Sequence, residues 1–258
     1  MVLISLFFCP AYGAEDEDNV YIIPVKGEIT PAMAVFFKEK ISEANNRNAK
    51  GIIVELTTLG GRVDSAIEMK EAILKSRVPI VVYVEGRAIS AGALITIAAP
   101  KIIMEPGSHI GSAEPIPYSE KNVAFLRGEF QAAAKRWGRD EKIAQAMVDK
   151  NIEVTGLSPK GSLLDIDAET AYQYGYADAV LQDREEVLDY LGFKEMHIIE
   201  IVPGPTVRIA QFLTRSDVAS FLLAVAFIAL LAEFFIQGFG ISGIIGIVSL
   251  ILYFGGGY

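Results

Sequence analysis

A serine at the expected start of an apolar helix is the residue of this sequence best suited to nucleophilic chemistry. Ser90 follows a strand-like run, residues 79–84, and opens an apolar stretch that ends before Pro100. The first N–H groups of a helix have no partner inside it and lie at the positive end of its dipole, so they stabilise negative charge forming on a substrate carbonyl. Small residues at 91–93 leave room for a peptide. The alternative is that Ser90 only caps the helix, a common use of serine.

Two other segments stand in a set order around this serine. Upstream, residues 51–56 predict a buried strand, and a turn with a glycine pair (Thr57 to Asp64) leads into a helix. Downstream, Met104 to Gly111 precedes a charged helix that begins near Lys121. This order resembles the membrane-anchored serine proteases of the NfeD type, the ClpP-class partners of stomatin operons, and more distantly signal peptide peptidase A and ClpP. The resemblance extends from about Val20 to the last residue.

Composition restricts the partners and cofactors. The net charge of −9, from 23 basic and 32 acidic residues, argues against a nucleic-acid partner. Apolar residues make up 52% of the chain and the mean hydropathy is +0.36, which is high for a protein without a membrane segment. A single cysteine, Cys9, excludes an internal disulfide and a cysteine-based metal site. No metal-ligand cluster or phosphate-binding loop is visible, so no cofactor is expected.

The first residues predict an export signal. Residues 1–14 combine an apolar start with a small-residue cleavage motif at Ala11 and Gly13, before an acidic run. No lysine or arginine precedes the apolar part, which departs from the usual pattern and suggests a truncated signal. The alternative is a buried N-terminal strand. Cleavage would leave a mature chain without cysteine, which suits an oxidising compartment.

The middle of the chain alternates predicted strands and helices. Thr30 followed by Pro31 marks a helix start, and the strands around it are continuous apolar runs, typical of a sheet covered on both faces. This alternation predicts an α/β fold, which periodicity alone cannot separate from a doubly wound sheet. The family resemblance narrows it to a ClpP/crotonase-like spiral of ββα units, as a serine protease domain over residues 19–200.

The general base is assigned through the resemblance. The position of the ClpP histidine corresponds here to Ala113, and we expect His109 to be a loop residue and His197 to lie far away, which argues against a Ser-His-Asp triad. NfeD-type proteases use a Ser–Lys dyad, with the lysine at a helix start ahead of a Gly-Arg-Asn/Asp element. Lys121 stands seventeen residues before Gly138, as the resemblance implies. The alternative is that Lys121 is a solvated first-turn residue.

The resemblance also implies two oxyanion donors. These are backbone N–H groups, one from the glycine turn and one from the residue after the serine, and they correspond to Gly60 and Ala91. Two departures weaken the preorganisation of the first donor. Thr57 stands where the family has an acidic residue, and Leu59 stands where it has a proline.

The last forty residues change character. Residues 201–216 are expected to be a linker, and residues 217–258 a transmembrane hairpin that begins the NfeD membrane region. A carboxylate at that depth, Glu233, should face a protein interior, and the glycines after it should let helices pack closely. The alternative is a buried hydrophobic hairpin. Family members continue into further spans and a small β-barrel, so the resemblance implies a fragment.

The sequence thus predicts a multi-pass membrane serine endopeptidase with an extracytoplasmic protease domain. Ser90 would be the nucleophile, Lys121 the general base, and Gly60 and Ala91 the oxyanion donors. The resemblance implies hydrophobic peptide substrates, stomatin-like (SPFH) membrane proteins as substrates or partners, and a homo-oligomer. Two alternatives stay open: a crotonase-type acyl-CoA enzyme, and a catalytically inactive protease-like membrane scaffold.

Overall fold

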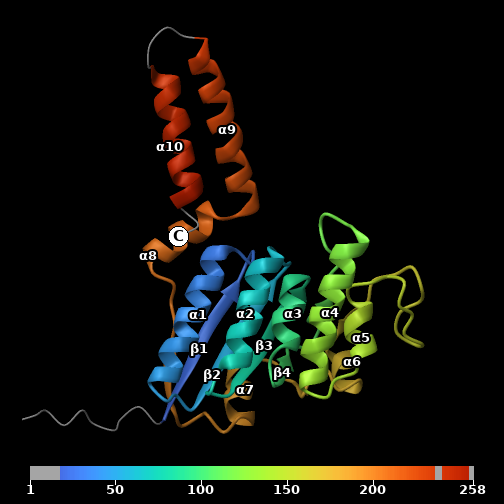
Figure 1. Ribbon diagram of the computed structural model, residues 1–258. Helices are drawn as coiled ribbons and strands as arrows, with labels where there is room; N and C mark the ends of the chain where they lie inside the picture. The colour runs from blue at the N-terminus through green and yellow to red at the C-terminus, as the bar shows by residue number, and fades with distance from the viewer. Residues whose placement is uncertain (1–17, 236–239, 256–258) are drawn as a thin grey trace, which may run out of the picture.

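An α/β domain carries a pair of long helices that project from one of its ends (Figure 1). The computed structural model describes residues 18–235 and 240–255. The predicted signal over residues 1–14 lies outside these residues, so it stays a prediction.

A single sheet of eight strands forms the centre of the domain, in the order β6-β5-β3-β2-β1-β8, with β4 and β7 branching from β3. Every pairing is parallel except that of β5 with β6. The strands are β1 (Asn19–Lys26), β2 (Gly51–Thr58), β3 (Ile80–Ile89), β4 (Lys101–Met104), β5 (His109–Gly111), β6 (Asp165–Asp167), β7 (Ala179–Val180) and β8 (His197–Glu200).

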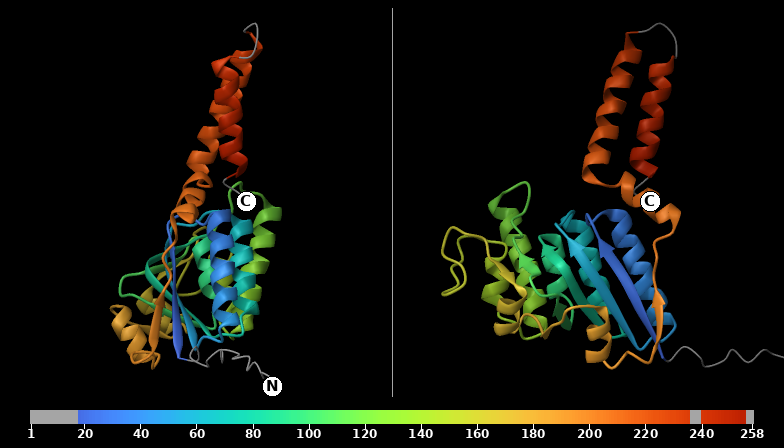
Figure 2. Two further views of the ribbon diagram at one scale, coloured as in Figure 1. Left: turned by 90° about the vertical axis from the view of Figure 1, so that its left-hand side faces the viewer. Right: turned by 180° about the vertical axis from the view of Figure 1, so that it is seen from behind.

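The helices α1 to α4 stand side by side on one face of the sheet, and α7 lies on the other (Figure 2). The helices are α1 (Pro31–Asn46), α2 (Val63–Lys75), α3 (Ala91–Ile97), α4 (Glu120–Arg136), α5 (Glu141–Ala146), α6 (Ala168–Gln173), α7 (Arg184–Tyr190), α8 (Pro205–Leu213), α9 (Ser216–Phe234) and α10 (Ile241–Gly255).

Both faces of the sheet are buried. Along β1, Tyr21 and Ile23 belong to the large core beneath α1 to α4, whereas Val20 and Ile22 belong to a smaller core with Val187 of α7. Successive strand residues point to opposite faces, so both sets of positions must be apolar. This explains the continuous apolar runs of the sequence and confirms the expected two-sided burial.

Local sequence signals predict the start of α1 and both ends of α2. Thr30 caps α1, accepting a hydrogen bond from the N–H of Met33 at 3.2 Å, and Pro31 is the first helical residue, as predicted. The predicted helix from Val63 to Lys75 has the same bounds as α2.

Helices α9 and α10 pack against each other as an antiparallel pair (Figure 1). Within the described residues, α9 is the one helix long and apolar enough to cross a membrane, and α10, with 15 residues, is shorter. A Cβ on Gly246 would lie 2.7 Å from Cγ of Leu230, so this glycine allows the close packing that we expected. The Glu233 carboxylate accepts hydrogen bonds from backbone N–H groups at the start of α10, including that of Gly243 at 2.7 Å.

Candidate active site

Ser90 lies in a strained turn between β3 and α3. Its backbone has φ 57° and ψ −116°, a region that residues other than glycine rarely adopt. The Ser90 N–H donates to the Gly111 carbonyl at 2.9 Å, and the Ser90 carbonyl accepts from the N–H of Ala93 at 3.0 Å, which holds the turn. The hydroxyl makes no capping hydrogen bond to α3. The capping role therefore does not explain this serine, and its geometry resembles a strand-to-helix nucleophile turn.

The glycine pair lies directly against Ser90. A Cβ on Gly60 would lie 2.7 Å from Cβ of Ser90 and 3.1 Å from its Oγ. A Cβ on Gly61 would lie 2.3 Å from the carbonyl oxygen of Ile29. Ile29 binds this turn from both sides, since its N–H donates to the Gly60 carbonyl and its carbonyl accepts from the N–H of Arg62, each at 2.9 Å. Both positions thus require glycine, with φ of 112° and 154°.

The two expected oxyanion donors differ in their present partners. Ala91 is the first residue of α3, so its N–H has no carbonyl partner inside the helix. The N–H of Gly60 donates to Oγ1 of Thr58 at 2.9 Å, and the Thr58 hydroxyl lies 3.2 Å from the Gly60 carbonyl. An oxyanion would have to replace Thr58 as the acceptor of the Gly60 N–H.

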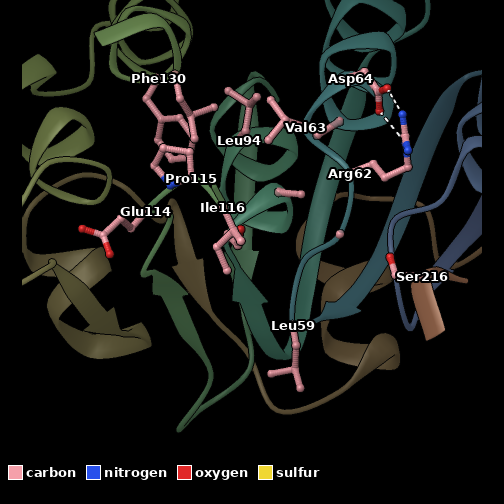
Figure 3. A pocket seen from close by; sticks show the side chains of 15 residues that line it. Leu59, Arg62, Val63, Asp64, Leu94, Glu114, Pro115, Ile116, Phe130 and Ser216 are labelled. Carbon is pink, nitrogen blue, oxygen red and sulfur yellow. Dashed lines mark hydrogen bonds and ion pairs between the residues drawn. The ribbon is translucent and has the colours of Figure 1, made fainter. Parts of the chain in front are cut away.

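A pocket of about 570 Å³ opens beside Ser90 (Figure 3). Apolar side chains and polar groups share its wall. The apolar ones come mostly from three helices and the loop before α4; these residues are Val63, Ala66, Ala91, Leu94, Leu126, Phe130, Pro115 and Ile116. Arg62 and Asp64 form an ion pair on another side. This hydrogen-bonded pair raises the pKa of Arg62 and lowers the pKa of Asp64, so both stay charged at neutral pH.

Lys121 is not among the residues that line this pocket. It is the second residue of α4, after the capping residue Ser119, and its side chain is exposed. The pocket residues of the same helix, Leu126 and Phe130, follow five and nine positions later. At 3.6 residues per turn these offsets place Lys121 on the opposite side of α4. The structure therefore does not bring Lys121 and Ser90 together, and the dyad stays a prediction.

Two other lysines near the pocket are held in ion pairs. Lys150 lies 3.0 Å from the carboxylate of Glu114, a pocket residue, and this hydrogen bond raises the pKa of Lys150. Burial of Lys70 favours its neutral form, but its contacts with Glu129 (2.6 Å) and Glu71 outweigh that effect and raise its pKa. Raised pKa values keep both lysines protonated, which is the opposite of what a general base requires.

Neither histidine lines the pocket beside Ser90. His109, expected in a loop, instead begins β5, where it pairs with Arg87 of β3. Its Nδ1 lies 3.5 Å from the Asp165 carboxylate, and the side chain is half exposed. His197 is an exposed residue of β8, at the far edge of the sheet. Within the described residues, no group of acidic residues and histidines is placed to hold a metal ion.

Sequence reasoning missed the contribution of Arg139. Its guanidinium is buried and donates to the carbonyls of Ile97 (3.0 Å), Ala99 (2.9 Å) and Pro100 (3.3 Å), at the C-terminal end of α3. A cation here satisfies carbonyls that the helix leaves unpaired and complements the helix dipole. Burial lowers the pKa of Arg139, although an arginine still stays charged. The one signal in the sequence is that Arg139 belongs to the Gly-Arg-Asp element.

Replacing Arg139 by alanine is expected to destabilise the domain by about 3 kcal/mol, because several buried carbonyls would lose their donor. Thermal unfolding of the purified chain measures this. Arg136→Ala, which removes an exposed arginine from the end of α4, is the matched control and should leave the midpoint nearly unchanged. Equal midpoints for the two variants would contradict the assigned role.

One end of the pocket reaches the first residue of the long apolar helix. Ser216 of α9 lines the pocket, as Figure 3 shows. The Glu28 carboxylate accepts hydrogen bonds from the Ser216 N–H at 3.2 Å and from its hydroxyl. Glu28 directly precedes Ile29, which holds the glycine turn. The start of α9 is therefore attached to the segment that supports the Gly60 donor.

Comparison with known families gives two matches. The NfeD1b N-terminal domain matches residues 19–201, and the NfeD integral membrane domain matches residues 217–258. The membrane protein NfeD1b of Bacillus subtilis is 32% identical over 260 residues, covering 98% of this chain and 60% of that protein. The membrane-bound protease PH1510 of Pyrococcus horikoshii is 27% identical over 262 residues, covering 90% and 57%. The chain thus spans less than two thirds of the length of these relatives.

Solved structures of similar proteins share the fold of this chain. A lysine-to-alanine variant of the 1510-N membrane-bound stomatin-specific protease, in complex with a substrate peptide, superposes with a TM-score of 0.66 at 26% identity, covering 77% of this chain and 98% of that one. A serine-to-alanine variant gives 0.64 at 27% identity, covering 73% and 99%. ClpP1 from Listeria monocytogenes gives 0.53 at 16% identity, covering 64% and 94%, which shows the ClpP-like fold alone.

Proposed function

Because this chain belongs to the NfeD family of membrane proteins, we propose that it is a membrane-bound serine protease with Ser90 as its nucleophile. The observation that carries the proposal is the strained Ser90, whose hydroxyl makes no capping bond, beside a glycine turn and a pocket with apolar side chains. The relatives add support, since one of them is named a membrane-bound protease and its solved forms include a serine variant.

In the proposed reaction, Oγ of Ser90 attacks the scissile carbonyl while a base accepts its proton. The carbonyl oxygen becomes an oxyanion that accepts hydrogen bonds from the N–H groups of Ala91 and Gly60. The Gly60 N–H then exchanges Thr58 for the stronger, charged acceptor. The positive end of α3 lies at the same place and adds to the stabilisation.

We assign the general base to Lys121. Support comes from its spacing to the Gly-Arg-Asp element and from the relative whose lysine variant was solved with a substrate peptide. The loop before α4 supplies Pro115 and Ile116 to the pocket, so it connects the pocket to the first turn of α4. The assignment requires this loop and turn to close over a bound substrate, which would also remove the lysine from water.

The substrate class follows from the pocket wall. The apolar side chains that line the pocket beside the nucleophile, among them Leu94 and Phe130, favour a large hydrophobic side chain next to the scissile bond. Since the related 1510-N protease is named stomatin-specific, we propose that the substrate is a hydrophobic segment of a stomatin-like membrane protein.

Enlarging the pocket should shift its preference. We compare two peptides, one with tryptophan and one with valine at the cleavage position. In Phe130→Ala, the ratio of their kcat/KM values should rise in favour of tryptophan by about 10-fold, the discrimination that one or two buried methylene groups provide. Phe125→Ala is the matched control, because Phe125 is 54% exposed on the same helix and does not line the pocket. Assays with paired peptides measure the ratio. An unchanged ratio in Phe130→Ala would show that substrates do not occupy this pocket.

The domain bounds, the location and the oligomeric state are also proposed from the family membership. Residues 19–200 form the protease domain, residues 201–216 the linker, and residues 217–258 the start of the membrane region. We place the protease domain outside the cytoplasm, after removal of a signal within residues 1–14, in a multi-pass homo-oligomer.

Covalent labelling tests the proposal against its alternatives. A fluorophosphonate should modify the wild-type chain in detergent or liposomes, and mass spectrometry should locate the adduct on Ser90. A crotonase-type enzyme would instead retain coenzyme A and need no reactive serine. An inactive scaffold would bind membrane partners without being labelled. Absence of labelling at Ser90 under conditions where the domain is folded would remove the protease assignment.

A further inference from the structure

Helix α8, between the α/β domain and α9, carries large apolar side chains that are more than half exposed. Its inward side packs on the domain, with Val207 against the large core and Nε2 of Gln211 3.5 Å from the sulfur of Met33. Ile209 and Phe212 are 60% and 55% exposed. They are three positions apart, so they share one side of the helix. Phe212 also borders a pocket of about 450 Å³ that Lys26 and Met33 of the domain help to line, whereas Ile209 does not.

The same helix lies at the edge of the membrane region. α8 ends at Leu213 and α9 begins at Ser216, where the NfeD integral membrane domain also starts. α8 lies at an angle to α9, on the side of the domain from which α9 and α10 project (Figures 1 and 2). The bond of Ser216 to Glu28 fixes the start of α9 to the domain. The exposed face of α8 is therefore within a few residues of the bilayer boundary.

We propose that α8 lies in the headgroup layer of the bilayer, with Ile209 and Phe212 inserted at the boundary with the acyl chains. An amphipathic helix with large apolar residues on one face and arginine beside them is suited to this position. Arg208 stands at the outer side of α8, in a chain whose net charge is −9. A basic residue at this site is favoured by anionic lipid headgroups.

Lipid is favoured over a protein partner by the continuity of the chain. A helix whose end is two residues from a membrane span has lipid as its nearest apolar surroundings. The lipid contact would also hold the active-site pocket, which Ser216 lines, close to the membrane surface. This second consequence rests on the proposed protease function, whereas the contact of α8 with lipid does not.

Fluorescence quenching by lipid tests the proposal. The full chain with Phe212→Trp is reconstituted in liposomes of phosphatidylcholine and phosphatidylglycerol, with or without brominated phosphatidylcholine. Tyr172→Trp is the matched control, because Tyr172 is an aromatic residue of α6 with 58% exposure, on a helix away from α9 (Figure 1). The sole native tryptophan, Trp137, follows α4 at the end remote from the membrane helices and gives a common background.

The expected result is a loss of the emission added by Phe212→Trp in brominated lipid and no loss for Tyr172→Trp. Two results would overturn the proposal. Equal, weak quenching by brominated lipid together with strong quenching by aqueous iodide would place α8 in water. Protection from both quenchers would mean that protein, such as a second copy of the chain, covers the face instead of lipid.

Discussion

Replacing Ser90 by alanine is expected to lower kcat/KM for peptide cleavage by about 10³-fold or more, the range for loss of a serine nucleophile. The substitution removes the attacking oxygen but keeps the backbone turn, the pocket and the donor N–H groups. KM should therefore change little, and fluorophosphonate labelling should be lost. Cleavage of a hydrophobic peptide by the full chain in liposomes measures both constants.

The matched control for this variant is Ser112→Ala. Ser112 also has a positive φ, of 48°, and its hydroxyl lies 3.4 Å from a carboxylate oxygen of Asp165, but it does not line the pocket. Its replacement should leave labelling and kcat/KM within about twofold of wild type, because its side chain does not line the pocket. If Ser90→Ala cleaved as fast as Ser112→Ala, Ser90 would not be the nucleophile.

Replacing Lys121 by methionine is expected to reduce kcat by about 10²- to 10⁴-fold, the usual contribution of a general base. Lys121→Arg should be equally impaired, because arginine keeps the charge but cannot give up its proton near neutral pH. A merely structural or surface charge would be preserved in Lys121→Arg, so this variant separates the two roles.

Lys142→Met is the matched control, because Lys142 is also the second residue of an exposed helix start, that of α5. It should cleave at the wild-type rate. Full activity of Lys121→Met with Ser90 still labelled would refute the dyad while leaving the protease assignment intact.

Much of the fold was predictable from local patterns. The bounds of α2 and the cap of α1 depend on residues within one or two turns of each helix. The short strands β5 and β6 were not predictable, because they have only three residues each and are defined by their partners. His109 illustrates this, since it is a strand residue only through its pairing with Arg87, twenty-two positions away.

The candidate site was predictable in part. Ser90 was found from its position before an apolar helix, and the structure adds that the backbone strain turns its hydroxyl away from the capping role. The hydrogen bond from the Gly60 N–H to the Thr58 hydroxyl was not predicted, because the family resemblance concerns the neighbouring residues Thr57 and Leu59. The buried Arg139 was likewise missed, since its three carbonyl partners lie about forty residues away.

By itself, the sequence determined the α/β elements, the helix that carries the nucleophile and the apolar helix pair, because each depends on composition and spacing within a short segment. Only the tertiary structure decided which side of α4 faces the pocket. Burial of Leu126 and Phe130 sets that side, and the helical period then turns Lys121 outward. Contacts between distant segments depend on how helices pack on the sheet, and no local pattern encodes that packing.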